Sequence, residues 1–190
     1  MNIMKKRFSN RIAILGLLIS IVIVFSFMGC ASSPKGFDPS VKGPQMIVEP
    51  CAIRLGVATL TKTAIVFKGK GFQPGDSVFV KLLDVYNGKD AVQDIPVADG
   101  NVDKEGNFVA KVGILVKVSE LLKAKLGSNK KMETVIIVTR SPIPEGVYTA
   151  RAVSMEADKT AECKLEVKGP STMDSIKDWL GGVLGKIQKK

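Results

Sequence analysis

Residues 67–82 read FKGKGFQPGDSVFVKL, and this stretch decides the fold. Residues 63–72 are rich in β-branched and aromatic residues and predict one strand, and residues 77–85 predict the next. Between them, Pro74 suits the first central position of a tight turn, because its ring fixes φ, and Gly75 is free to take a positive φ. The stretch therefore predicts a strand, a turn and a second strand.

The same texture continues on both sides. DKEG at 103–106 and PEG at 144–146 indicate two further turns. Pro96 places its strand at a sheet edge, because proline cannot donate to the ladder of a central strand. About seven strands at regular spacing predict an all-β sandwich. The remaining predicted strands are 46–48, 95–97, 107–116, 135–139, 147–153 and 161–167.

Three motifs resemble a bacterial immunoglobulin-like module, and the resemblance covers residues 46–168. The motifs match its GxGFxPGDxV opening, its DxxGxF hairpin and its PxGxYxxxA closing strand. The resemblance implies an immunoglobulin-like β-sandwich of about seven strands, and it says little about function because these are turn and core signatures. The matching residues are Gly69, Gly71, Phe72, Pro74, Gly75, Asp76, Val78, Asp103, Gly106, Phe108, Pro144, Gly146, Tyr148 and Ala152.

Residues 117–132 interrupt the strand pattern as an insertion. A helix is expected at 118–126, with Ser119 as its cap and Gly127 at its end. A basic loop, 128–131, follows it. Such an insertion either covers one end of the core as a lid or forms a binding loop.

The N-terminus has the layout of a secretory signal. Four basic residues within 5–11 precede an apolar run at 12–28. Residues 27–30, FMGC, resemble the lipobox of bacterial lipoproteins, in which cleavage after Gly29 leaves Cys30 to receive lipid, including palmitate. Residues 1–29 are then a removed signal peptide. The alternative is an uncleaved anchor with an ordinary Cys30.

The resemblance to lipoproteins also implies a location. An aspartate directly after the lipidated cysteine would resemble an inner-membrane retention signal, but residue 31 is Ala. The outer membrane is therefore favoured if the envelope has two membranes. Residues 30–44 are rich in Ser, Pro, Gly and Lys, and they predict a flexible tether. The sandwich domain is expected at 45–169, and a C-terminal helix at 170–190.

Charge and cysteine content bound the function further. From Cys30 on there are 24 basic and 18 acidic residues, a net charge of +6. This favours anionic lipid or a plain solvated surface, and nucleic acid is not expected because no Arg-aromatic motif is present. Cys51 and Cys163 are an even pair in an exported protein and are expected to be bridged, unless they are buried free thiols. The module's first and last strands run side by side, which implies the same pairing.

No catalytic constellation is recognisable. The chain has no histidine, which removes the commonest general base and metal ligand. Residues 99–106 resemble the start of a calcium loop, but Lys104 and Ala110 stand where that loop needs Gly and Glu. Other carboxylates are scattered. We therefore expect no metal, no cofactor and no enzymatic activity.

The last twenty residues predict an amphipathic helix. Ser171 can cap it. Its apolar face and the cations near its end suit a membrane interface or a protein partner, although packing on its own domain, self-association and disorder are alternatives. The face comprises Met173, Ile176, Leu180, Val183, Leu184 and Ile187, with Trp179 at its border.

These observations predict a lipid-anchored, non-catalytic envelope protein with a binding or structural role. An accessory subunit is the alternative, docking a transport or secretion machine through the insertion or the C-terminal helix. A hydrolase is the least favoured reading, since it would need carboxylates gathered in a cleft.

Overall fold

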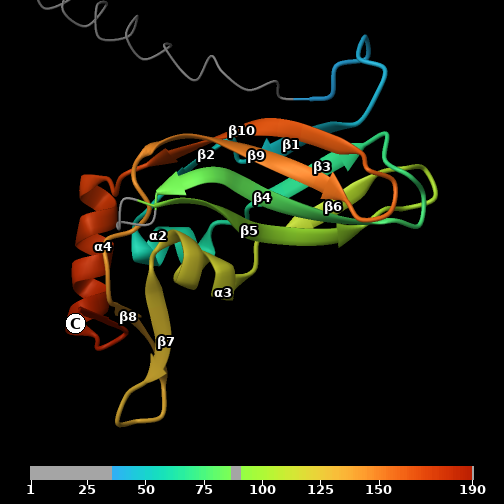
Figure 1. The fold of residues 1–190 in the computed structure, drawn as a ribbon. Helices are drawn as coiled ribbons and strands as arrows, with labels where there is room; N and C mark the ends of the chain where they lie inside the picture. Colours follow the sequence, from blue (N-terminus) through green and yellow to red (C-terminus); the bar gives the residue numbers. More distant parts are fainter. Residues whose placement is uncertain (1–35, 87–90, 190) are drawn as a thin grey trace, which may run out of the picture. The chain divides into compact units, whose positions relative to one another are not determined.

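The computed structural model describes residues 36–86 and 91–189, which are mostly β (Figure 1). The predicted lipobox, Cys30 and the first part of the predicted tether lie outside the described residues. Most predicted strands are present with small changes of boundary, but the strand predicted at 107–116 ends at Lys111. The described residues contain eleven strands, not about seven. The predicted edge strand at 95–97 is the centre of a longer one that lies at a sheet edge.

Two sheets form the body of the domain. One has the order β1-β3-β6, and the other has the order β2-β10-β9-β4-β5. All their pairs are antiparallel except β2 with β10, which is parallel. The first sheet comprises β1 (Gln45–Glu49), β3 (Val66–Lys70) and β6 (Phe108–Lys111). The second comprises β2 (Ala52–Arg54), β4 (Ser77–Tyr86), β5 (Val92–Asn101), β9 (Gly146–Ser154) and β10 (Thr160–Lys168).

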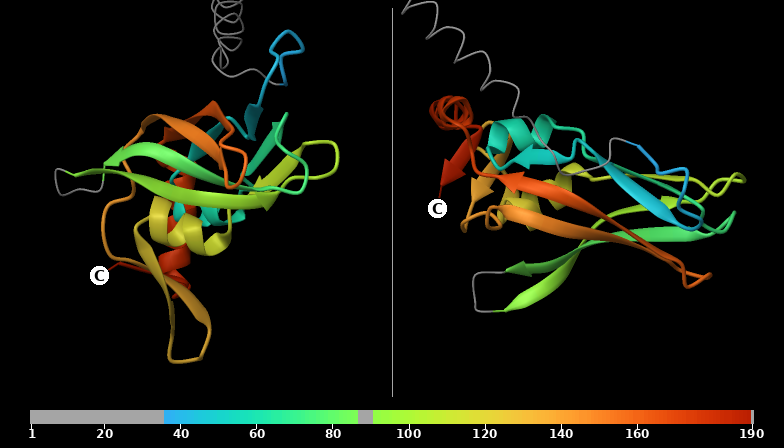
Figure 2. Two further views of the ribbon diagram at one scale, coloured as in Figure 1. Left: turned by 45° about the vertical axis from the view of Figure 1, so that its right-hand side comes forward. Right: turned by 90° about the horizontal axis from the view of Figure 1, so that it is seen from above.

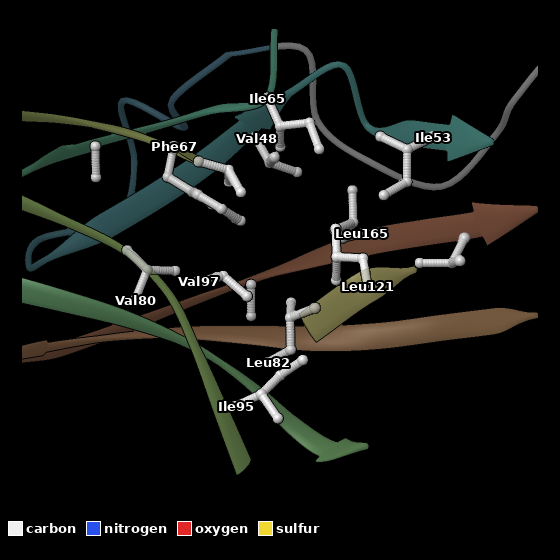
Figure 3. Close-up of a cluster of buried hydrophobic side chains, with 14 of the residues drawn as sticks. Val48, Ile53, Ile65, Phe67, Val80, Leu82, Ile95, Val97, Leu121 and Leu165 are labelled. Carbon is white, nitrogen blue, oxygen red and sulfur yellow. The ribbon is translucent and has the colours of Figure 1, made fainter. Parts of the chain in front are cut away.

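Alternation along the strands builds one core between the two sheets. In β4, Val78, Val80 and Leu82 are buried, whereas Phe79 and Lys81 are exposed. Side chains from both sheets join them in a single apolar cluster (Figure 3). Burying aliphatic side chains in this way supplies most of the driving force for folding.

The buried carboxylate of Asp76 joins the turn before β4 to the turn between β9 and β10. Asp76 accepts hydrogen bonds from the Ser154 hydroxyl and from the backbone amides of Glu156 and Ala157. Its pKa lies below the ordinary 3.8, chiefly because of the Ser154 hydroxyl, with smaller help from backbone amides. The aspartate of the PGDS turn therefore organises the β9–β10 turn as well.

The Tyr148 side chain is bonded to the backbone just before β9. Its hydroxyl donates to the carbonyl of Pro144, 2.7 Å away and four residues upstream. The contact fixes the entry of β9, and burial raises the pKa of the phenol.

The insertion differs from its prediction. Its helical part starts earlier, as α3 (Ile114–Val116) and the π-helical turn η1 (Lys117–Leu121), without a cap at Ser119. Ile114, expected on the buried face of a strand, is exposed. The second half is the hairpin β7 (Ala124–Ser128) and β8 (Thr134–Val138). The helix predicted at 118–126 is thus wrong beyond Leu121.

Pairing explains this outcome. β7 finds a partner strand in β8 across a turn in which the Asn129 side chain accepts from two backbone amides, those of Lys131 and Glu133. Cross-strand bonds of this kind override a weak local helix propensity. A third sheet, of order β11-β8-β7, results.

The predicted disulfide is absent, because Cys51 and Cys163 are both free thiols. β2 and β10 do run side by side, with Ala52 paired to Glu166. That register places Cys51 beside Leu165, two residues from Cys163, which corresponds to a Cα separation of about 8 Å at the usual strand rise and spacing. A disulfide spans less than about 7 Å. Burial raises the pKa of the Cys163 thiol to about 12.

The two-sheet body has two dissimilar ends (Figure 2). At the turn end, residues 71–77, 99–107 and 154–160 contact one another through backbone bonds such as Phe72 to Gly106. The chain enters here, since Gln45 is paired with Lys70. At the helix end lie α2 (Val57–Lys62), α4 (Thr172–Val183) and the insertion. The described part of the predicted tether folds onto the turn end, with the Lys70 ammonium 5.1 Å from the Phe37 ring centre.

The Asp76 cluster yields a stability prediction. We expect Asp76→Asn to lower the urea midpoint at neutral pH. The carboxylate accepts from the Ser154 hydroxyl and from the amides of Ser77, Glu156 and Ala157, whereas the side chain of Asn offers one uncharged oxygen as acceptor. The lowered pKa means that the carboxylate stabilises the fold above about pH 4 and that this contribution is lost as the pH falls through its folded-state value. The variant should therefore show a weaker acid dependence of its midpoint.

The matched control for this prediction is Asp99→Asn, at an exposed position on β5. It should leave the urea midpoint unchanged. Equal midpoints for wild type and Asp76→Asn across the acid range would contradict the role given to the cluster.

Candidate docking surface

The helix end is organised around the short helix α2. Its N-cap residue is Gly56, which has no side chain to cap the first amides. Those amides donate instead to Asp178 of α4: Val57 N–H to Oδ2 at 2.9 Å and Ala58 N–H to Oδ1 at 2.8 Å. A carboxylate at this place satisfies two unpaired donors and favours the positive end of the helix dipole.

The opposite end of α2 receives a cation. The Lys117 ammonium, buried beneath η1, donates to the carbonyl of Thr63 at 2.6 Å. Burial lowers the pKa of Lys117. Charges of the sign that complements the helix dipole thus hold both ends of α2, and they join it to the insertion and to the C-terminal helix.

α4 is capped by Ser171, as predicted, and Asp174 of the same capping box joins α4 to α2. The Ser171 hydroxyl accepts from the Asp174 amide, and the Asp174 carboxylate accepts from the Ser171 amide, which forms a capping box. Asp174 also accepts from the Thr59 hydroxyl at 2.5 Å. These bonds, that of Thr59 first, lower the pKa of Asp174 to about 2.

Gly56 permits this close approach. A Cβ added at Gly56 would lie 2.5 Å from the Cβ of Asp174, closer than real side-chain atoms come. The two acidic residues sit on the polar side of α4, four positions apart and therefore one above the other. α4 consequently packs on its own domain through its polar side.

The end of α4 corrects the predicted helix boundary. Gly185 takes a positive φ of 69°, and the amides of Lys186 and Gly185 donate to the carbonyls of Gly181 and Gly182. This is a Schellman ending, which stops the helix two turns before the predicted end. The following residues form β11 (Ile187–Lys189), parallel to β8.

Ile187 therefore does not belong to the apolar face of α4. It is partly buried against the core. A Cβ added at Gly181 would lie only 2.6 Å from the Cδ1 atom of Ile187. Close approach of Ile187 explains a glycine inside the helix, which otherwise disfavours helical structure.

The remaining six predicted residues point away from the domain. They are 48 to 69% exposed, with Leu180 the least and Trp179 the most exposed. Contiguous apolar surface of this kind is rare on soluble proteins and marks interaction sites. We call this surface the outward face; it comprises Met173, Ile176, Trp179, Leu180, Val183 and Leu184.

The helix end is richer in basic residues than the turn end. Segments 113–143 and 169–189 contain nine basic and four acidic residues, and two of the four acids, Asp174 and Asp178, are engaged with α2. In contrast, segments 36–45, 71–77, 99–107 and 154–160 at the turn end contain three basic and seven acidic residues. The basic residues at the helix end are Lys117, Lys123, Lys125, Lys130, Lys131, Arg140, Lys177, Lys186 and Lys189.

The carboxylates weighed for catalysis or calcium have local structural contacts. Asp103 accepts from the amides of Glu105 and Asn107 within its own turn. Glu120 pairs with Lys123, and Glu133 accepts from Asn129. Within residues 36–86 and 91–189, no three Cys, Asp or Glu side chains are grouped as a metal site.

Comparison with known proteins gives no family. No family model and no curated protein matches the chain. Among solved structures, the chain is similar to the β-glucosidase from Listeria innocua in complex with glucose, at 13% identity and a TM-score of 0.31, over 70% of this chain and 17% of that one. It is also similar to the alkylpurine DNA glycosylase AlkC from Pseudomonas fluorescens bound to DNA, at 13% identity and a TM-score of 0.30, over 67% and 31%.

The chain thus spans less than a third of either neighbour. These likenesses carry no argument about fold or activity. A search of the described helices finds none with the length and apolar character needed to cross a bilayer.

Sequence reasoning found the outward face but missed what holds it. The helical spacing puts Asp178 on the polar side of α4, but it does not indicate the partner of its carboxylate. α2 itself was not predicted, because six residues give too short a pattern. The one available signal was Gly56, which has no side chain to cap the amides that follow it, so that these amides need an acceptor from elsewhere in the chain.

The geometry predicts that α4 can be released by small changes. Asp178→Ala removes the acceptor for two helix N-terminal amides and should lower the free energy of unfolding by about 1 kcal/mol, the usual cost of a lost N-cap. Gly56→Ala should displace Asp174 and have a similar effect. In both variants, hydrogen exchange at the Val57 and Ala58 amides should be faster than in wild type.

The control for these variants is Gly36→Ala, where an added Cβ meets nothing within 4 Å. It should leave exchange unchanged. If Asp178→Ala exchanged as slowly as wild type at those two amides, the docking described for α4 would be wrong.

Proposed function

We propose that this chain is a lipid-anchored, non-catalytic protein of the bacterial cell envelope that acts by binding through its helix end. The observation that carries the proposal is the outward face of α4. Six large apolar side chains are exposed on one helix whose polar side is fixed to the domain. Such a face is costly to expose to water unless it contacts something.

The N-terminal sequence supports the anchor. A basic segment, an apolar run and FMGC at 27–30 resemble the processing signal of lipoproteins. Lipid on Cys30 places the domain at a membrane, and Ala31 favours the outer one where there are two. Two or three acyl chains on one cysteine give firm attachment, since each buried CH₂ contributes about 0.8 kcal/mol.

We also propose that the fold is immunoglobulin-like. The strand orders β1-β3-β6 and β2-β10-β9-β4-β5, with β2 parallel to the last strand of the body, support this view. The Tyr148 contact supports it too. The helix α2 and the hairpin β7–β8 are additions to such a sandwich, and both lie at the helix end.

Docking to a larger envelope machine is the second candidate. It is favoured by the tip of the β7–β8 hairpin, where Met132 is 87% exposed beside Lys130 and Lys131. An exposed methionine on a projecting hairpin suits an adaptable protein contact.

Palmitate labelling tests the anchor. In cells given radiolabelled palmitate, wild type and the control Cys51→Ser should carry label and float with membranes. Cys30→Ser should carry none. Mass spectrometry of the wild type should show a chain that begins at a lipidated Cys30.

An unlabelled wild type, or label that persists in Cys30→Ser, would overturn the lipoprotein reading. An intact N-terminus at Met1 would favour the uncleaved anchor instead.

A further inference from the structure

We propose that the outward face of α4 binds the anionic lipid surface of the membrane that holds Cys30, so that the domain lies along that membrane. The inference rests on the proposed function for the anchor alone.

Charge favours an anionic surface. An isolated interfacial helix carries its cations on its own polar side. In α4 that side is occupied by α2, and the cations come from neighbours instead: Lys177 on the helix flank, Lys186 just past its end, and Lys130 and Lys131 on the hairpin. The same surface attracts the helix end more than the acidic turn end, so the field favours contact through α4 when the domain lies along the membrane.

The chemistry of the face suits lipid better than protein. Between Trp179 and Leu184 the exposed arc offers no hydrogen-bonding side chain except the indole N–H of Trp179. Protein interfaces use about one hydrogen bond per 100–200 Å², whereas an acyl boundary needs none. An indole at the edge of an apolar face is typical of a membrane interface, where one side of the ring is apolar and the other is wet.

A second copy of the chain fits less well. A symmetric dimer through this face would bring the same lysines together, and like charges across an interface are unfavourable. α4 has twelve residues and is about 18 Å long, which is short for an interface that must bury more than about 1,000 Å².

Placement allows lipid and face to reach one membrane. Residues 30–37 can extend over at most about 25 Å, because each residue adds no more than about 3.6 Å. From Gln45 to Arg54 the chain crosses the sandwich over about 30 Å at the usual strand rise. A domain lying along the membrane satisfies both limits. The anchor then holds the face at a high effective concentration, so that a weak interfacial affinity suffices.

Vesicle flotation of the mature chain carrying Cys30→Ser tests the face without its lipid. The protein should float with vesicles of phosphatidylcholine and phosphatidylglycerol in equal parts and should stay behind with phosphatidylcholine alone. Binding should weaken as salt is raised. Trp179, the single tryptophan, should shift its emission to the blue on binding.

Substitutions on the face provide the decisive comparison. Ile176→Gln with Val183→Gln should weaken binding at least about tenfold, because two buried apolar side chains are lost from the bound state. The control is Val109→Gln, equally exposed on β6 and away from the helix end. Lys130→Glu with Lys131→Glu should reduce binding to the anionic vesicles, and its control is Lys104→Glu at the turn end.

Three outcomes would overturn the inference: no flotation with either vesicle, equal flotation with both, or a wild-type dimer that the Ile176 and Val183 substitutions convert to monomer. Circular dichroism confirms that the variants are folded. The flotation experiment uses a chain without lipid, so it is independent of palmitate labelling. If flotation fails and wild type is still labelled, the outward face does not bind lipid but the anchor stands. If flotation succeeds and wild type is unlabelled, the face binds lipid but the anchor is wrong.

Discussion

Two carboxylates of α4 determine which side of this helix packs on the domain. Asp174 and Asp178 are bonded to the first turn of α2, where Gly56 leaves both space and unpaired amides for them. An amphipathic helix near a protein core is expected to bury its apolar side. Here unsatisfied amides and a helix dipole compete with that tendency, and α4 turns its apolar side outward. The outward face follows from this orientation, whereas the helix ends where Gly185 takes a positive φ.

The two ends of the sandwich use the same device for different purposes. At the turn end, Asp76 accepts from a hydroxyl and three amides and connects two turns of the sheet body. At the helix end, Asp178 connects two helices and Lys117 connects a third segment. In each case one charged group satisfies backbone atoms that no regular ladder reaches. The first arrangement holds the β body together, whereas the second presents a surface.

Much of this could be predicted from sequence where a pattern is local. The PGDS turn, the strands on either side, the edge strand with Pro96 and the Ser171 cap all depend on a few adjacent residues, and each is confirmed. The predictions that were wrong depended on distant pairing. Ala124–Ser128 became a strand because β8 lies beside it, Ile187 joined β11, and the parallel register of β2 with β10 keeps Cys51 from Cys163. The six residues of the outward face share one side of the predicted helix, and they are exposed in the structure. Which side of α4 packs on the domain stayed open, since it depends on a carboxylate contact 120 residues apart in sequence.

Acrylamide quenching of Trp179 fluorescence in the lipid-free chain tests this orientation most directly. The indole is 69% exposed on the outward face and is the single tryptophan, so its emission reports this face without interference. The structure predicts emission typical of a solvated indole and quenching close to that of free tryptophan, with the helix still folded by circular dichroism. Blue-shifted emission with little quenching would show that α4 packs through its apolar side, and the docking surface would then not exist in the isolated domain.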